Sequence, residues 1–278
     1  MIVDAHHHFW DPAAASYPWL TDELQVLRRR FGPEDLAPEL SATGVEATIV
    51  VQTRAALDET REFLALAGTS SFVRGVIGWV DLTDPGVADV LAELRAGPGG
   101  GRLVGVRHQA QDEPDAAWLA RSDVRRGIRA VGTAGLAYDL LVRARELPAA
   151  LELARSLPDV RFVLDHLAKP PIATGAVEPW STLVGRFERL ENVACKVSGM
   201  VTEAAWRTWR IEDLRPYVDR ALDVFGAGRL LFGSDWPVCL LAAGYAQVLD
   251  VARQVLDGLG AGEQEGVFGK NALAIYRL

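Results

Sequence analysis

Near its start the chain reads Ile2-Val3-Asp4-Ala5-His6-His7-His8-Phe9-Trp10-Asp11, an apolar run that turns into a histidine cluster. If this stretch is a β-strand, successive side chains alternate between its two faces. Asp4, His6 and His8 then share one face, and His7 points the other way, into the layer between strand and helices. Two imidazoles at this spacing can bind one metal ion, or they can form a neutral polar wall at the end of a strand.

Two other interpretations of the histidine cluster have to be weighed. A remnant of an affinity tag is disfavoured, because the run is only three residues long and leads from an apolar strand pattern straight into Phe9-Trp10-Asp11-Pro12. A structural role, in which the histidines cap one end of a barrel, remains open. The chain has five histidines, and the other two, His108 and His166, each end another strand-like run.

Composition limits the classes of function. The chain has 278 residues, nearly half of them apolar, and a net charge of −8. This acidic balance argues against sequence-independent binding of nucleic acid and gives no support for binding to anionic membranes. No apolar run is long enough to span a membrane, and the first residues lack the basic region of a signal peptide. Two cysteines, Cys195 and Cys239, fit a reducing cytoplasm, and we expect both to be buried thiols.

Strand-like apolar runs alternate with helical stretches along the whole chain. The runs are nearly continuous in apolar residues, as in a parallel sheet that is covered on both faces. After the first strand they are expected at Val45–Thr53, Phe72–Val80, Leu103–His108, Leu136–Val142, Val160–His166, Val193–Ser198 and Leu230–Asp235. Helices are expected at Pro33–Thr43, Asp58–Gly68, Pro85–Arg95, within 113–130, at Pro148–Leu157, within 178–190, and at Glu212–Phe225, Tyr245–Leu259 and Asn271–Tyr276.

Eight β/α units in a chain of this length predict a single (β/α)8 barrel domain over residues 1–278, because this fold typically takes about 250 residues. A doubly wound open sheet is the alternative. It is disfavoured because the first strand is not followed by a Gly-x-Gly-x-x-Gly turn. Residues 10–33, rich in aromatic side chains and proline, form an excursion after the first strand. This segment either folds over a pocket or packs on the rim without touching a ligand.

The barrel hypothesis makes the placement of polar residues informative, because active sites in this fold lie at the carboxyl ends of the strands. His6 and His8 end the first strand, His108 the fourth, His166 the sixth and Asp235 the eighth. Buried polar groups are costly unless they are paired or ligated. A common site explains these five residues more simply than several independent polar networks at one end of the barrel.

Several motifs together resemble the amidohydrolase superfamily, and more narrowly its amidohydrolase-2 group of sugar lactonases, which includes L-fuconolactonases and L-rhamnonolactonases. The motifs run in order along the chain: Asp4-x-His6-x-His8-Phe9-Trp10-Asp11-Pro12, Tyr17-Pro18-Trp19-Leu20, Gly105-Val106-Arg107-His108 with Gln111, Leu164-Asp165-His166-x-x-Lys169-Pro170, Cys195-Lys196-Val197-Ser198-Gly199, and Gly233-Ser234-Asp235-Trp236-Pro237-Val238-Cys239. The resemblance implies the barrel fold and a hydrolase that opens a sugar-derived aldonolactone.

The resemblance also implies a metal site, with departures from the binuclear members of the superfamily. Those enzymes use a carboxylated lysine and two further histidines, whereas the fifth and seventh strands of this chain carry no histidine. At most one divalent ion is therefore expected, with His6, His8, His166 and Asp235 as ligands. Three imidazoles and one carboxylate suit Zn²⁺. Because the group also resembles lactonases that need no metal, the ion can be dispensable.

Lactone hydrolysis needs a positioned water, a base and hydrogen-bond donors at the carbonyl oxygen. We expect Asp235 to be the base and His166 to take part in catalysis. We expect His108 to touch the substrate, or else to orient another group. The residues expected to bind the sugar are Trp10, Trp79, Gln111, Tyr138, Lys169 and Trp236, although core packing is the alternative for each tryptophan.

Charged residues elsewhere refine the expected substrate. Lys169 either binds a product carboxylate or pairs with Asp165. Lys196 lies in the middle of a strand and is expected in a buried ion pair. Arg54 and Arg107 are isolated in the sequence, which argues against a dicarboxylate lactone.

Two rival functions remain. One is a different reaction at the same site, catalysed by a decarboxylase or an amide or imine hydrolase. The other is a non-catalytic sugar-acid-binding barrel. The expected partner is a small sugar lactone, with no nucleic acid and no membrane, and a homo-oligomer is possible because any exposed helix face could pair.

Overall fold

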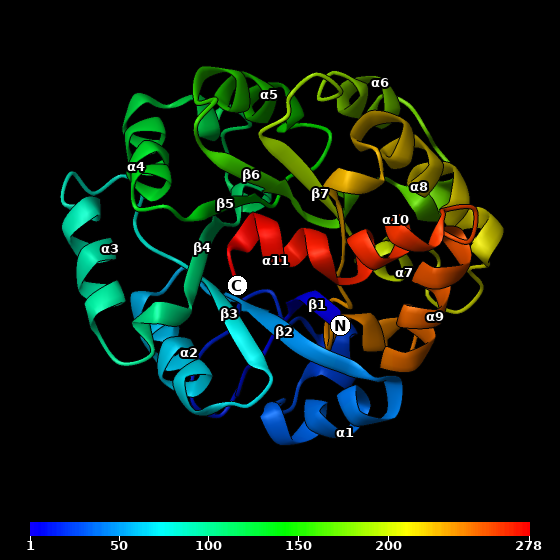
Figure 1. Ribbon diagram of the computed structural model, residues 1–278, viewed down its shortest axis with the longest axis horizontal. Helices are drawn as coiled ribbons and strands as arrows, with labels where there is room; N and C mark the ends of the chain where they lie inside the picture. Colours follow the sequence, from blue (N-terminus) through cyan, green and yellow to red (C-terminus); the bar gives the residue numbers. More distant parts are fainter.

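The computed structural model describes residues 1–278 as one closed barrel of eight parallel strands surrounded by helices (Figure 1). The strand order follows the sequence, from β1 to β8. The strands are β1 (Ile2–His7), β2 (Val45–Val51), β3 (Val73–Gly78), β4 (Leu103–His108), β5 (Ala137–Leu140), β6 (Arg161–Leu164), β7 (Val193–Val197) and β8 (Leu230–Phe232). The predicted (β/α)8 barrel is thus confirmed, and all eight strands lie within the predicted runs.

The helices also follow the predicted alternation. They are α1 (Pro33–Thr43), α2 (Leu57–Thr69), α3 (Val87–Ala96), α4 (Ser122–Thr133), α5 (Leu147–Ser156), α6 (Trp180–Gly185), α7 (Met200–Glu203), α8 (Ile211–Phe225), α9 (Tyr245–Val255), α10 (Ala261–Glu265) and α11 (Asn271–Tyr276). The helix predicted within 178–190 is reduced to α6, and the excursion after β1 contains a 3-10 helix at Asp22–Leu27. No helix combines the length and apolar content that a membrane span requires.

The barrel closes between β8 and β1 at the end of the strands that carries the site. The Asp235 amide donates a hydrogen bond to the His6 carbonyl (N···O 2.8 Å), and the His8 amide donates to the Trp236 carbonyl (2.7 Å). These two bonds bring the end of the first strand and the segment after the last strand side by side. The closure therefore places the first histidine pair next to Asp235, which lies more than two hundred residues away in the sequence.

The opposite end of the barrel is covered by α11, which crosses the centre of the ring in Figure 1 with both chain termini nearby. Ala272 and Tyr276 of this helix pack against the apolar side chains that fill the barrel interior. Those interior residues include Val3, Ile49 and Val163. Helix α11 therefore closes the barrel at the amino ends of the strands. The centre of the barrel is accessible only from the carboxyl ends of the strands.

Candidate active site

A cavity of about 320 Å³ lies at the carboxyl ends of the strands. Its size is within the range of small-molecule sites. Its walls come from the excursion after β1 and from the loops that follow β2, β4, β5, β6 and β8. The lining residues are His8, Trp19, Leu24, Leu27, Thr53, Arg107, Gln109, Gln111, Asp112, Leu141, Arg143, His166, Lys169, Asp235 and Val238.

The end of β1 carries the histidines, but its faces differ from simple alternation. Val3 and Ala5 point into the barrel, so Asp4 points outward, where it accepts hydrogen bonds from the Ser234 hydroxyl (2.6 Å) and from Tyr245 (3.1 Å). The expectation that Asp4 shares a face with His6 and His8 is therefore wrong. The physical reason is an irregularity in the β1–β2 register between Asp4 and His7, which shifts the alternation.

Beyond this irregularity the histidines are placed as predicted. His6 and His8 face each other, with their Nε2 atoms 3.2 Å apart. His7 points to the opposite side, where its Nε2 lies 2.9 Å from the Thr48 hydroxyl in the layer between the barrel and the helices. The Nδ1 atom of His8 lies 2.8 Å from the carbonyl oxygen of Val51. That contact requires a proton on Nδ1 and leaves the Nε2 lone pair directed at the site.

Asp235 lies among three imidazoles. Its Oδ1 atom is 3.4 Å from His8 Nε2, 3.8 Å from His6 Nε2 and 3.9 Å from His166 Nε2. The backbone of Asp235 is left-handed, with φ 56°. Residues other than glycine rarely adopt this conformation, and it is concentrated at functional sites. The turn after β8 thus directs the carboxylate back over the barrel axis instead of along the strand.

His166 follows β6 in a second left-handed turn, in which His166, Leu167, Ala168 and Lys169 all have positive φ, with φ 52° at His166. The His166 Nδ1 atom lies 2.9 Å from the Ser198 hydroxyl, so the ring is held from behind by the segment after β7. A Cβ atom on Gly199 would lie only 2.7 Å from this Nδ1 atom. Glycine at position 199 is therefore required for the histidine ring to pack against the chain.

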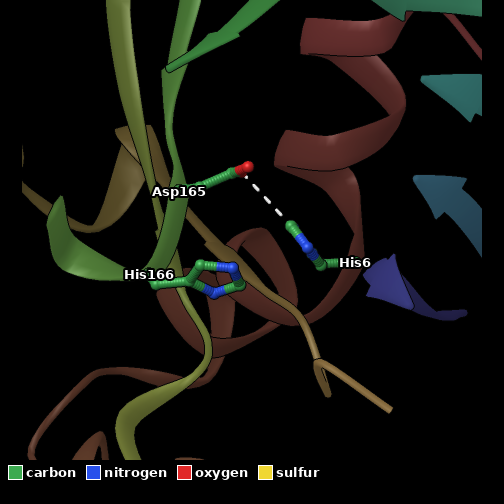
Figure 2. A group of neighbouring side chains, drawn as sticks. All are labelled: His6, Asp165 and His166. Carbon is green, nitrogen blue, oxygen red and sulfur yellow. Dashed lines mark ion pairs between the residues drawn. The ribbon is translucent and has the colours of Figure 1, made fainter. Parts of the chain in front are cut away.

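The carboxylate of Asp165 lies next to the ring of His6. Figure 2 shows the side chain of Asp165 directed at the ring of His6, with His166 beside them. The Asp165 Oδ1 atom is 3.3 Å from His6 Nδ1. Because Asp165 also contacts Arg107 and Lys196, at 3.0 and 2.9 Å, it does not pair with Lys169. Lys169 instead lies 3.6 Å from Glu203 and lines the cavity.

Burial and neighbouring charges set the protonation states of these groups. Burial lowers the pKa of His166 to about 4 and that of His6 well below its usual value, so both imidazoles are neutral at pH 7. Burial alone would raise the pKa of Asp235, but His166, His8 and Lys169 reverse this effect and lower it. The site at neutral pH therefore contains an ionised carboxylate beside the neutral imidazoles of His6 and His166.

The donor atoms of His6, His8 and Asp235 lie within 4.8 Å of one another, and all three residues are buried. Two imidazoles and one carboxylate are a typical ligand set for a catalytic zinc ion. His166 belongs to a second such group, with His6 and Asp165. The residues thus fit one divalent ion, with His166 at the edge of the first group.

His108 does not line this cavity, contrary to the expectation that it touches the substrate. Its Nδ1 atom accepts a hydrogen bond from the Trp79 indole N–H (3.0 Å), and its Nε2 atom lies 2.7 Å from Glu113. Its ring stacks on Trp118, with centroids 4.1 Å apart. Both ring nitrogens are therefore engaged outside the cavity, and Trp79 is held there with it. Neither residue lines the cavity, which favours the alternative that His108 orients another group.

Three other residues expected to bind the sugar are packed into the core. Trp10 donates its indole N–H to the Leu27 carbonyl (3.0 Å) and is only 3% exposed. Trp236 packs against Phe31, with ring centroids 5.5 Å apart, and Tyr138 lies on the outward face of β5 and is fully buried. None of the three lines the cavity: Trp10 and Trp236 pack with the aromatic rings of the excursion, and Tyr138 packs against Phe162 of the next strand.

Gln111 and Lys169, by contrast, line the cavity, and the excursion contributes Trp19, a residue of its aromatic motif. Sequence reasoning missed Arg143, which follows the end of β5 and is exposed with no acidic partner. Arg107, Arg143 and Lys169 together make the cavity wall more cationic than the isolated arginines suggested. Arg143 could have been found from its position directly after the predicted strand Leu136–Val142.

Comparison with known proteins agrees with this geometry. The model of the amidohydrolase family matches residues 3–278. An L-fucono-1,5-lactonase of Burkholderia ambifaria is 40% identical over 280 residues, covering 99% of this chain and 95% of that protein. An L-fucono-1,5-lactonase of Burkholderia multivorans is also 40% identical, over 287 residues, covering 99% of this chain and 96% of that protein.

A solved structure is similarly close. The crystal structure of an amidohydrolase from Burkholderia multivorans with bound zinc is 38% identical and superimposes with a TM-score of 0.95, covering 100% of this chain and 99% of that chain. Both the family model and these relatives extend over nearly the whole sequence. The chain therefore belongs to the amidohydrolase family.

Proposed function

We propose that this protein hydrolyses a sugar-derived aldonolactone, with Asp235 as the base that activates water. One observation carries the proposal: a buried carboxylate lies among three imidazoles at the edge of a cavity of about 320 Å³. The substrate class is supported by the names of the two 40% identical relatives, both L-fucono-1,5-lactonases.

A lactone is an activated ester, so the chemistry asks little more of the protein than a base and hydrogen-bond donors. Asp235 takes a proton from the attacking water and later passes it to the ring oxygen as the ester bond breaks. His166, whose Nε2 faces Asp235, fixes the carboxylate and the water next to it.

A divalent ion fits the same residues. His6, His8 and Asp235 would hold it, and we propose zinc because the ligand set and the zinc-containing relative both favour this metal. When bound, the ion supplies Lewis-acid chemistry at the lactone carbonyl and lowers the pKa of water. The neutral state of His6 favours such binding, because metal ligands must be deprotonated.

The two walls of the cavity orient the sugar. Trp19, Leu24 and Leu27 of the excursion form an apolar wall together with Val238. The loops after β4 and β5 form a polar wall, in which Gln111 and the free guanidinium of Arg143 offer hydrogen bonds to hydroxyl groups. We propose that Lys169 binds on this side as well, and that the least polar edge of the lactone faces the excursion.

The experiment that tests the function is a screen of five- and six-membered aldonolactones, read by proton release. The wild type should open one or more neutral aldonolactones and leave amides and aromatic acids unchanged. Asp235→Asn should lower kcat by about 10²- to 10⁴-fold, the usual contribution of a general base. Asp112→Asn is the matched control, because Asp112 lines the same cavity but is exposed and lies outside the histidine group.

Each rival predicts a different result. A decarboxylase or amide hydrolase would act on its own substrate class and not on lactones. A sugar-acid-binding barrel would bind the lactone without turnover, and Asp235→Asn would then have no activity to lose. Full lactonase activity of Asp235→Asn would overturn the role given to this carboxylate.

The state of the two cysteines bears on the cellular compartment of the protein. Cys195 and Cys239 are both free and buried, as the sequence predicted. Reducing compartments maintain cysteines in this state, so we propose that the protein is cytoplasmic.

A further inference from the structure

The barrel interior contains a column of charged side chains below the cavity. Asp139 on β5, Lys196 on β7 and Asp165 after β6 are fully buried, and Arg107 on β4 is 3% exposed. The inward-facing residues beneath this layer are apolar. Replacing a buried ion pair by apolar side chains is often neutral or stabilising, so packing alone does not explain these charges.

The upper end of this column reaches a proposed metal ligand. Lys196 Nζ lies 2.5 Å from Asp139 Oδ2 and 2.9 Å from Asp165 Oδ1, and Asp165 Oδ1 lies 3.3 Å from His6 Nδ1. On the other side of the ring, Arg107 Nη1 lies 3.3 Å from His6 Nε2. Lys196 Nζ also lies 3.2 Å from His6 Nδ1, but its two shorter contacts are with the carboxylates of Asp139 and Asp165. Because arginine can only donate, its contact with Nε2 favours the tautomer whose proton is on Nδ1, facing Asp165.

The lower end of the column reaches the C-terminal helix. The Tyr276 hydroxyl lies 2.9 Å from each carboxylate oxygen of Asp139. Tyr276 belongs to α11, which crosses the end of the barrel opposite the cavity (Figure 1). A continuous series of polar contacts thus runs through the barrel from the last helix to the first histidine of the site.

We propose that Tyr276, Asp139, Lys196 and Asp165 form a positioning chain that holds the His6 ring with its Nδ1–H on Asp165 and its Nε2 lone pair facing His8 and Asp235. Histidine ligands commonly donate their second N–H to a carboxylate, which fixes the ring and its tautomer. Here that carboxylate is itself fixed by Lys196, and Lys196 by Asp139. The proposal rests on the role of His6 as a ligand in the proposed function.

The test compares isosteric variants. Asp165→Asn removes the acceptor next to His6, and Tyr276→Phe removes only the hydroxyl at the far end of the chain. Tyr217→Phe is the matched control, because its hydroxyl donates to the Ala176 carbonyl (3.1 Å) outside the barrel interior. Two quantities are measured: zinc affinity by competition with a chromophoric chelator, and the tautomer of His6 in metal-free protein by ¹⁵N NMR, with the signal assigned by its loss in His6→Asn.

The wild type should show the Nδ1–H form of His6. Asp165→Asn should shift His6 towards the Nε2–H form and weaken zinc binding by about 10- to 100-fold. Tyr276→Phe should weaken zinc binding by about fivefold, as expected for the loss of one hydrogen bond, and Tyr217→Phe should leave both quantities unchanged.

The proposal is overturned if His6 keeps the wild-type tautomer population in Asp165→Asn and Tyr276→Phe binds zinc as tightly as Tyr217→Phe. If Asp165→Asn does not fold, the comparison of the two tyrosine variants decides. If the wild type binds no zinc, the metal part of the proposed function fails, and the NMR measurement alone decides whether the chain positions His6.

Discussion

Replacing Lys196 by methionine should destabilise the fold strongly, because Lys196 is the centre of the buried charge column. Its Nζ atom contacts two carboxylates, at 2.5 and 2.9 Å, and is fully buried. With Arg107, the four charges of the column sum to zero. Lys196→Met leaves this buried group with one uncompensated negative charge, and breaking a buried pair typically costs about 3–5 kcal/mol.

The size of the effect can be limited by considering protonation. Asp139 retains only the Tyr276 hydroxyl after the substitution, so it is the carboxylate that takes up a proton. Holding Asp139 protonated at pH 7, against its ordinary pKa of 3.8, costs about 4 kcal/mol at about 1.4 kcal/mol per pH unit. Burial raises the pKa of Asp139 to about 6 in the wild type as well, so about 3 kcal/mol of this cost is already present there, and protonation of Asp139 adds about 1 kcal/mol to the loss at pH 7. At pH 5 Asp139 is protonated in both proteins and this contribution vanishes. The sign follows because removing Lys196 raises the folded pKa of Asp139 further, so the destabilisation grows as the pH rises above about 6.

Urea denaturation of metal-free protein at pH 7 and pH 5, followed by tryptophan fluorescence, measures this difference. Lys270→Met is the control, because Lys270 pairs with Glu265 on the surface. The double variant Lys196→Met, Asp139→Asn restores a neutral column and should be more stable than Lys196→Met alone. A loss below about 1 kcal/mol, the scale of a surface pair, or a loss that does not change between the two pH values would refute the reasoning.

Three further predictions follow from the site. Arg143→Met should raise KM for a hydroxylated lactone by about tenfold while changing kcat little, because a cation on the cavity wall with no acidic partner contributes to substrate binding and not to the chemical step. Steady-state kinetics measure both constants, and an unchanged KM would show that Arg143 does not contact the substrate. Zinc removal by a chelator should lower kcat and re-addition should restore it, and full activity of protein shown to be metal-free by elemental analysis would eliminate the Lewis-acid role. Burial lowers the pKa of His7 to about 3, so the unfolded chain binds a proton at this residue below about pH 6.5 while the folded chain does not. Lowering the pH from 7.5 to 5 should therefore cost about 2 kcal/mol at this residue, and urea denaturation of His7→Gln should show a smaller loss than the wild type over that range.

The barrel was predictable because its strands are buried on both faces. Val45–Val51 is one of several apolar runs that the structure places in the sheet. Strand ends were less predictable at β6 and β8, where His166 and Asp235 were assigned to strands. Both residues adopt left-handed backbone, which the local sequence does not favour and which only the surrounding packing imposes.

At the site, the titratable residues were easier to predict than the residues that line the cavity. Titratable side chains at several strand ends pointed to one place because strand direction alone brings them together. The tryptophans were harder, because an apolar ring next to a strand end serves a pocket wall and a core equally well. Trp10 and Trp19 lie in the same excursion, yet only Trp19 reaches the cavity. For His108 a local signal existed in Glu113, close enough in the sequence to engage the ring.

The buried pairing of Asp165 with Lys196 and Arg107 explains how a neutral imidazole at His6 coexists with a neighbouring carboxylate. An unpaired carboxylate next to a histidine would favour the imidazolium form and would compete with any metal for the ring. Burial would raise the pKa of Asp165, but Lys196, His6 and Arg107 hold it well below its usual value. Because Lys196 and Arg107 already compensate this charge, Asp165 can orient His6 without protonating it. The charged layer beneath the cavity thus supplies a fixed acceptor, while Asp235 remains the carboxylate that faces the substrate.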